Sequence, residues 1–335
     1  MTAQAFCPPP SHGILIEAPA RLHMGFLDLG GSLGRRFGSL GIAIDEIKTQ
    51  VRLYPAERLQ AEGPDAERAL KVGQQLEVLT GTSLPARIVI DEAVPPHAGL
   101  GSGTQMALAV GTGLSQLHGL GLSPWQIAMA CQRGSRSGIG IAVFEAGGLV
   151  LDAGRGPLTQ IPPVIARLPM PPDWRFIILL DPTFRGLSGT EEVNAFSDLP
   201  PFPEEEAARL CHWMTLRGLP AVLENDLATF GSVITDLQRT VGDHFSRAQG
   251  GRFTSQKVER ALEQLAMQGA TAIGQSSWGP TGFCLVENAD RAQGLIDHLE
   301  HLGAGGLCCQ IGTPRLMGAV TTSISIPDSH AAKTA

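Results

Sequence analysis

The sequence predicts an α+β protein of two domains. Its 335 residues exceed what one hydrophobic core usually organises, because such cores stop growing near ~250 to 300 residues. Strand-like and helix-like segments alternate on both sides of residues 161–173, a stretch that contains five prolines. We expect no regular structure in that stretch, and therefore place the boundary there, between domains at 1–168 and 169–335.

In the first domain, periodicity and end signals locate each element. Extended or alternating patterns predict strands at 14–18, 21–28, 49–54, 86–90 and 148–152. Apolar residues at helical spacing predict helices at 64–80, with Leu70, Leu76 and Leu79 inward, and at 104–118. A further helix is expected after Ser123, an N-cap followed by proline, with Gly134 as its left-handed end.

The second domain shows the same alternation. Strands are predicted at 174–180, 283–286 and 307–311, and helices after the N-cap Ser255 and at 291–301. An α+β second domain follows from this order.

Composition excludes several classes of function. A net charge of −7 gives no overall attraction to nucleic acid or to an anionic membrane, so we expect neither as a partner. The six cysteines show no CxxC pair and no zinc spacing, which predicts reduced, mostly buried thiols. Without a leader pattern or an apolar run of ~18 residues, a cytoplasmic protein is expected.

The most informative segment is PPHAGLGSGTQ at residues 95–105, between a predicted strand and a predicted helix. Its glycines let backbone N–H groups face an anion at the positive end of the helix. The Lys of a Walker A loop is missing, and a plain strand-to-helix turn is the alternative. The candidate phosphate-binding residues are His97, Gly99, Gly101, Ser102, Gly103, Thr104 and Gln105.

Two further segments supply polar groups. In APARLHMGFLDLGG at 18–31, Arg21 and His23 share one face of a strand and Asp28 follows, giving a cation, a donor and a carboxylate as candidate catalytic groups. Asp28 is the first choice for a metal or ribose contact, ahead of Glu145 and Asp152, although acidic residues are usually surface groups. GQSSWGPTGF at 274–283 is expected to be a loop between a helix and a strand, presenting backbone amides or serving as an ordinary connection.

These segments resemble, in order and separation, the three motifs of the GHMP kinase superfamily. On RLHMGFLD, GLGSGTQ, RGSRSGIG and GQSSWGPTG, the chain is identified as a member of the β-ribofuranosylaminobenzene 5'-phosphate synthase family. The resemblance implies an N-terminal domain like domain 2 of ribosomal protein S5 and a C-terminal ferredoxin-like α/β sandwich. It also implies a homodimer.

The implied activity is that of a pentosyltransferase in tetrahydromethanopterin biosynthesis. It joins 4-aminobenzoate to 5-phosphoribosyl 1-diphosphate, with loss of CO₂ and diphosphate, and requires Mg²⁺. A GHMP-type ATP-dependent kinase is the alternative, and Gly140 weakens it because several kinases of the superfamily carry an Asp base there. A non-catalytic binding protein and 4-hydroxybenzoate as the acceptor stay open.

For the implied reaction, the chemistry of the side chains indicates where each ligand is expected. The diphosphate is expected on residues 99–105, with Arg21 and, from RGSRSGIG, Arg133, Arg136 and Ser137; Arg133 alternatively caps the preceding helix. The aromatic acid is expected near Arg185, Ser276, Ser277 and Trp278, where Trp278 either stacks on the ring or packs inside the protein. Arg315 either reaches the 5'-phosphate or pairs with a surface acid.

Overall fold

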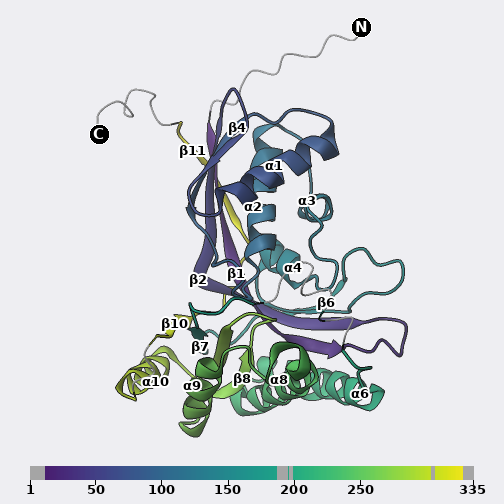
Figure 1. The fold of residues 1–335 in the computed structure, drawn as a ribbon, viewed down its shortest axis with the longest axis vertical. Helices are drawn as coiled ribbons and strands as arrows, with labels where there is room; N and C mark the ends of the chain where they lie inside the picture. Colours follow the sequence, from purple (N-terminus) through teal and green to yellow (C-terminus); the bar gives the residue numbers. More distant parts are fainter. Residues whose placement is uncertain (1–11, 187–194, 196–198, 303–305, 327–335) are drawn as a thin grey trace.

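The computed structural model describes residues 12–186, 195, 199–302 and 306–326, and these form two sheets with their helices (Figure 1). The seven-stranded first sheet has the order β11-β1-β2-β4-β3, with β5 between β2 and β6. Its strands are β1 (Gly13–Asp28), β2 (Phe37–Pro55), β3 (Gln60–Glu62), β4 (Ala86–Glu92), β5 (Leu149–Asp152), β6 (Val164–Leu168) and β11 (Val320–Ile324).

Four helices accompany this sheet: α1 (Ala66–Thr80), α2 (Ser102–Leu117), α3 (Pro124–Ala130) and α4 (Ile139–Ala146). Alternate residues of β1 and β2, such as Ile14, Ile16 and Leu53, pack in one core with the apolar side of α1 and α2. The sheet thus supports α2 from Met106 to Leu117.

The second sheet is four-stranded, with the order β10-β7-β9-β8. Its strands are β7 (Arg175–Leu180), β8 (Thr271–Gln275), β9 (Thr281–Val286) and β10 (Cys308–Gly312). Around it lie α6 (Glu204–Trp213), a π-helical turn (Met214–Gly218), α7 (Leu219–Leu223), α8 (Leu227–Gln249), α9 (Gln256–Met267) and α10 (Ala289–His301). With β8, β9 and β10 following β7 in the chain, this strand order is that of a ferredoxin-like fold.

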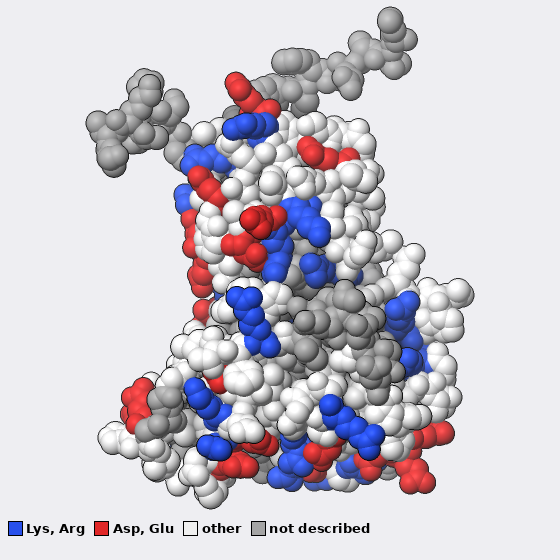
Figure 2. Space-filling view, in the orientation of Figure 1, with Lys and Arg blue, Asp and Glu red and all other residues white. Residues whose placement is uncertain are grey.

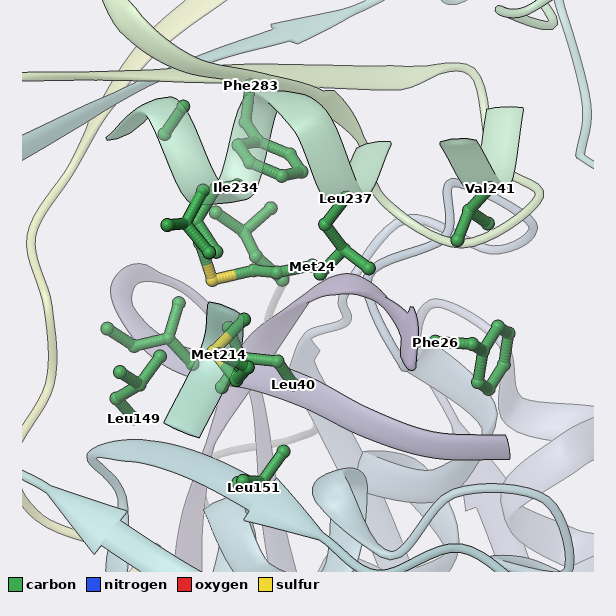
Figure 3. Packing of buried hydrophobic residues seen from close by; sticks show 14 of the residues in the cluster. Met24, Phe26, Leu40, Leu149, Leu151, Met214, Ile234, Leu237, Val241 and Phe283 are labelled. Carbon is green, nitrogen blue, oxygen red and sulfur yellow. The ribbon is translucent and has the colours of Figure 1, made fainter. Parts of the chain in front are cut away.

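The two sheets share a core. Ile177 and Leu179 pack under α9 and α10, whereas their neighbours Phe176 and Ile178 face the other way. There the core also takes in α8 and the second half of β1, and Figure 3 shows Met24 of β1 beside Ile234 and Leu237 of α8. Strand β11 also pairs with β1, so the chain returns to the first sheet after β10. The division at 168–169 remains a prediction.

The structure confirms the α+β class and most predicted elements. Ser123 forms a capping box at the start of α3, and the Ser255 side chain accepts a hydrogen bond from the Val258 amide at the start of α9. Gly134 has a φ of 82°, as a left-handed position requires. None of the helices in the described part of the chain has the length and apolarity for a membrane crossing.

Four expectations were wrong. The proline-rich stretch contains β6, which pairs with β5 while its prolines flank the strand. The segment at 274–283 joins two strands, because its first residues belong to β8. Leu79 is 50% exposed, since α1 buries its other side. Cys211 and Cys308 are exposed, so the described cysteines are not mostly buried; Cys7 lies outside the described residues.

Candidate functional site

Three of the predicted segments meet at the carbonyl oxygen of Gly99. This oxygen accepts hydrogen bonds from Arg21 Nη1 at 2.6 Å and from Ser276 Oγ at 2.7 Å. Ser276 Oγ in turn accepts one from the His23 amide at 2.9 Å, and the Arg21 amide donates to the Leu100 carbonyl at 3.1 Å. Strand β1, the loop before α2 and the β8–β9 hairpin are therefore locked together.

Glycines allow the backbones to cross at this junction. A Cβ on Gly99 would lie 2.0 Å from the Ser276 carbonyl oxygen, and one on Gly279 would lie 2.2 Å from that of Ala98. A Cβ on Gly186 would lie 2.4 Å from the Trp278 carbonyl oxygen, and the Gly186 amide donates to the His97 carbonyl at 2.9 Å. Side chains at these positions would force the loop and the hairpin apart.

The first turn of α2 presents a positive helix end. Gly101 precedes the helix with a φ of 84°, and no side chain caps the helix. Its carbonyl accepts from the amides of Thr104 and Gln105 at 3.0 Å each. The amides of half-buried Ser102 and of Gly103 are first-turn donors, which have no intrahelical acceptor. An anion is the natural partner of such donors.

Arg133 adds a cation to this helix end. Its guanidinium lies 3.2 Å from the point where a Cβ on Gly103 would stand, so glycine at 103 permits the approach. Arg133 is exposed to solvent, but the atoms packed around its guanidinium, and then the charge of Arg68, lower its pKa. No ion pair among the described residues involves Arg133, whereas Arg68 pairs with Asp65 at 2.9 Å. An anion would balance the charge of Arg133. Figure 2 shows Lys and Arg side chains around the middle of this face, with Asp and Glu beside some of them.

A buried carboxylate holds the RGSRSGIG segment in place. Asp152 is 1% exposed and accepts hydrogen bonds from the Gly138 amide at 2.9 Å, from Ser39 Oγ at 2.5 Å and from Ser137 Oγ at 3.3 Å. Burial raises its pKa, and the hydrogen bonds from Ser39 and from the Gly138 and Gly154 amides oppose the rise. Since its oxygens are occupied inside the protein, Asp152 positions this segment and is a poor metal ligand.

His23 lies behind the junction as a neutral imidazole. It is 2% exposed, and its Nε2 has no hydrogen-bond partner among the described residues. Burial, reinforced by the charge of Arg21, lowers its pKa well below the ordinary value. A cavity of about 20 Å³ beside it, lined also by Gln238 and Gln275, has room for one water molecule.

The depressed pKa of His23 predicts a pH-dependent stability. Below about pH 6.5, His23 is protonated in the unfolded chain but stays neutral in the folded chain. The free energy of unfolding therefore falls as the pH falls, by up to about 1.4 kcal/mol per pH unit. Urea titrations between pH 5 and 8 should show a shallower pH slope for His23→Gln than for the wild type. Replacing the exposed His212 should keep the wild-type slope; equal slopes for both variants would contradict the prediction.

Comparisons with known proteins show the family to which the chain belongs. The GHMP kinases N terminal domain matches residues 66–148, and the GHMP kinases C terminal domain matches residues 219–305. The beta-ribofuranosylphenol 5'-phosphate synthase of Archaeoglobus fulgidus is 35% identical over 289 residues, which cover 82% of this chain and 88% of the relative. The beta-ribofuranosylphenol 5'-phosphate synthase of Methanothermobacter thermautotrophicus is 30% identical, over 82% of this chain and 89% of the relative. The chain belongs to the β-ribofuranosylphenol 5'-phosphate synthase family.

This family has the GHMP fold, as predicted. A solved homoserine kinase from Cytophaga hutchinsonii superposes with a TM-score of 0.66 at 18% identity, covering 96% of this chain and all of that one. At this identity the likeness concerns the fold alone. The name shared by the synthase relatives specifies a phenol, so the para substituent of the acceptor stays open here.

In this synthase-family chain, Asp28 lies apart from the α2 helix end. Six residues of β1 lie between Asp28 and Arg21, a spacing of about 23 Å along an extended strand. Its Oδ1 accepts from the amides of Gly30 and Gly31 at 2.8 Å each. No group of three His, Cys, Asp or Glu side chains suited to a metal occurs in the described ranges. Asp28 does not fit a metal bound to diphosphate at α2, and its metal role stays a prediction.

The remaining candidates have varied surroundings. Ser276 is fully buried, so it positions the loop and does not face solvent. Trp278 is 2% exposed and stacks on Phe245 at 4.3 Å, which favours packing over contact with a substrate. Arg315 forms an ion pair with Asp45 at 2.6 Å, which is the predicted alternative to binding the 5'-phosphate.

Other predicted residues lie around the same segments. Gln105 donates to the Gly140 carbonyl at 2.8 Å, and so ties α2 to α4. Arg136 is half-buried within RGSRSGIG, and Ser277, with a φ of 57°, turns the hairpin. Arg185 is exposed next to Gly186, while residues 187–194 of the segment that follows lie outside the described residues. Glu145 is exposed on α4.

Sequence reasoning missed Ser39, Gly186 and Gly279. Ser39 gave no signal, because its importance comes from pairing with Asp152. The two glycines each stand beside a large side chain, Arg185 or Trp278, and only the contacts of the folded chain show why glycine is needed there.

Proposed function

We propose that this protein is a decarboxylating phosphoribosyltransferase that condenses 4-aminobenzoate with 5-phosphoribosyl 1-diphosphate, in tetrahydromethanopterin biosynthesis. The observation that carries the proposal is the uncapped first turn of α2 with the guanidinium of Arg133 beside Gly103. Such a site stabilises the negative charge that develops on a departing diphosphate. Membership of the synthase family supports the transfer of a ribosyl phosphate group as the reaction.

The bonds of the proposed reaction balance without a further reagent. Diphosphate leaves C1 of the ribose with its bonding electron pair, and the ring carbon that bears the carboxylate forms a bond to C1. The bond to the carboxylate then breaks, its electron pair restores the aromatic ring, and CO₂ departs. Arg133 and the amides of Ser102 and Gly103 would hold the diphosphate, while Arg21 fixes the loop through Gly99.

Gly140 favours the transferase over the kinase alternative. A Cβ at this position would lie 3.1 Å from Cγ2 of Thr104, and Thr104 belongs to the first turn of α2. A carboxylate base introduced there would need Thr104 to move. Position 140 therefore does not supply, beside the anion site, the group that would activate an alcohol for phosphoryl transfer.

Mg²⁺, a homodimer and a cytoplasmic location belong to the same proposal, and the family resemblance supports them. Mg²⁺ is often held by substrate phosphates and few carboxylates, so bound diphosphate would bring the metal to α2 and help to neutralise the leaving group. Since Asp28 does not fit that position, we derive no step through a protein-bound metal.

The decisive assay supplies the pure protein with 5-phosphoribosyl diphosphate, Mg²⁺ and carboxyl-labelled 4-aminobenzoate. We expect equal amounts of labelled CO₂ and diphosphate, with no need for ATP. ADP formation from ATP without CO₂ would establish the kinase instead, and release of neither product would indicate a binding protein. Repeating the assay with 4-hydroxybenzoate decides which para substituent is preferred.

A further inference from the structure

Arg68 lies in the first turn of α1, a helix that contacts both α2 and α3. Ala69, the next residue, is fully buried in the core that α1 shares with Met106 of α2 and Ile127 of α3. The backbone of Arg68 is therefore fixed against two helices, one that begins at the anion site and one that leads into Arg133.

The guanidinium groups of Arg68 and Arg133 lie near one another. Arg133 stands at the start of α2, with its guanidinium 3.2 Å from the point where a Cβ on Gly103 would lie. The charge of Arg68 lowers the pKa of Arg133. Coulomb interactions weaken with distance and are largely screened beyond ~8 Å at physiological salt. Two cations held this way repel one another, and an anion that contacts both would remove the repulsion.

Asp65 orients Arg68. Its Oδ2 forms an ion pair with Arg68 Nη1 at 2.9 Å, and both side chains are partly buried. Asp65 occupies the N-cap position of α1, where aspartate is a preferred residue, yet its side chain makes no capping hydrogen bond. Its φ of 60° is one that residues other than glycine seldom adopt. The carboxylate therefore holds the guanidinium instead of capping the helix.

The contact with Asp65 leaves Arg68 able to bind an anion as well. A guanidinium has five N–H donors in a planar fork, and the ion pair is made by Nη1. A fork of this kind suits the paired oxygens of a phosphate group. A diphosphate has two such groups, and the α2 amides with Arg133 account for one of them.

We propose that Arg68 is a specificity-determining residue that contacts the second phosphate of the diphosphate, while Arg133 and the α2 amides hold the first. Asp65 is its positioning residue. A monophosphate at the α2 end would lack the contact with Arg68, so the site selects diphosphates. The naming of the diphosphate rests on the proposed function, whereas the choice between the two anions is measurable without turnover.

Calorimetric titration of the full chain with inorganic diphosphate and with inorganic phosphate, at one fixed Mg²⁺ concentration, tests the proposal. The wild type should bind diphosphate more tightly. Arg68→Gln should weaken diphosphate about tenfold or more, the usual effect of losing a charge-assisted hydrogen bond, and leave phosphate nearly unchanged. Arg133→Gln should weaken both anions. Asp65→Asn keeps the cation but releases it, and should give a smaller loss of selectivity that is measurable even if Arg68→Gln does not fold.

Arg209→Gln is the matched control. Arg209 also pairs with a carboxylate three residues earlier, Glu206 at 2.5 Å, but it belongs to α6. Both anions should keep their wild-type affinities in this variant. The proposal would be overturned by equal weakening of the two anions in Arg68→Gln, or by a diphosphate affinity equal to that of Arg209→Gln.

Failure of the proposed function would look different. The wild type would then release no labelled CO₂ from 4-aminobenzoate, although it would still prefer diphosphate to phosphate and lose that preference in Arg68→Gln. The labelled-CO₂ assay on the same preparation separates the two failures.

Discussion

Gly99→Ala is expected to lower kcat/KM for 5-phosphoribosyl diphosphate by about 100-fold or more. The added Cβ would lie 2.0 Å from the Ser276 carbonyl oxygen, at a φ of 77° that side chains rarely adopt. The loop must therefore move away from the hairpin. A shift of about 1 Å in groups that position a reacting substrate is enough for a loss of this size.

Gly119→Ala is the matched control for backbone strain. Gly119 has a similar φ of 63°, but nothing lies within 4 Å of the point where its Cβ would stand, so this variant carries the strain without the collision. It should lose about 1 kcal/mol of stability and keep its activity. Steady-state rates, corrected for the folded fraction by circular dichroism, make the comparison. Equal activity in the two variants would show that the contact between Gly99 and Ser276 does not matter for function.

The sequence predicted the anion loop well because its signal is local. Glycines at 99, 101 and 103 between a strand and a helix specify the turn wherever it occurs, and the structure starts α2 at Ser102. Ser123 and Ser255 were equally local signals, since a cap acts on the amides two or three residues ahead. The sequence thus determined the elements that carry the site.

Contacts between distant segments were not readable in the same way. The partnership of Asp152 with Ser39 joins residues more than a hundred positions apart, so Asp152 looked like a possible metal ligand. Asp28 looked close to Arg21, yet an extended strand separates them. Helix α4 was missed because residues 139–146, apart from Glu145, are apolar or glycine and show no helical periodicity.

Arg133→Gln is expected to lower kcat/KM for 5-phosphoribosyl diphosphate by about 10²- to 10³-fold, the usual cost of removing a group that stabilises a developing anion. The reason is the position of the guanidinium beside Gly103, at an uncapped helix end and without an ion pair among the described residues. The KM for the aromatic substrate should change far less. Arg239→Gln, exposed on α8, is the control for a simple loss of charge and should leave both constants unchanged.

The same variant decides between the two roles open to Arg133. If the guanidinium capped α3, Arg133→Gln would lower the melting temperature and spare kcat/KM. In the described structure the backbone amide of Arg133, at 2.7 Å from the Ala128 carbonyl, is what closes the end of α3. Glutamine keeps that amide, so α3 should survive while the anion site loses its charge. Unchanged binding of the diphosphate substrate together with a lower melting temperature would return Arg133 to a structural role.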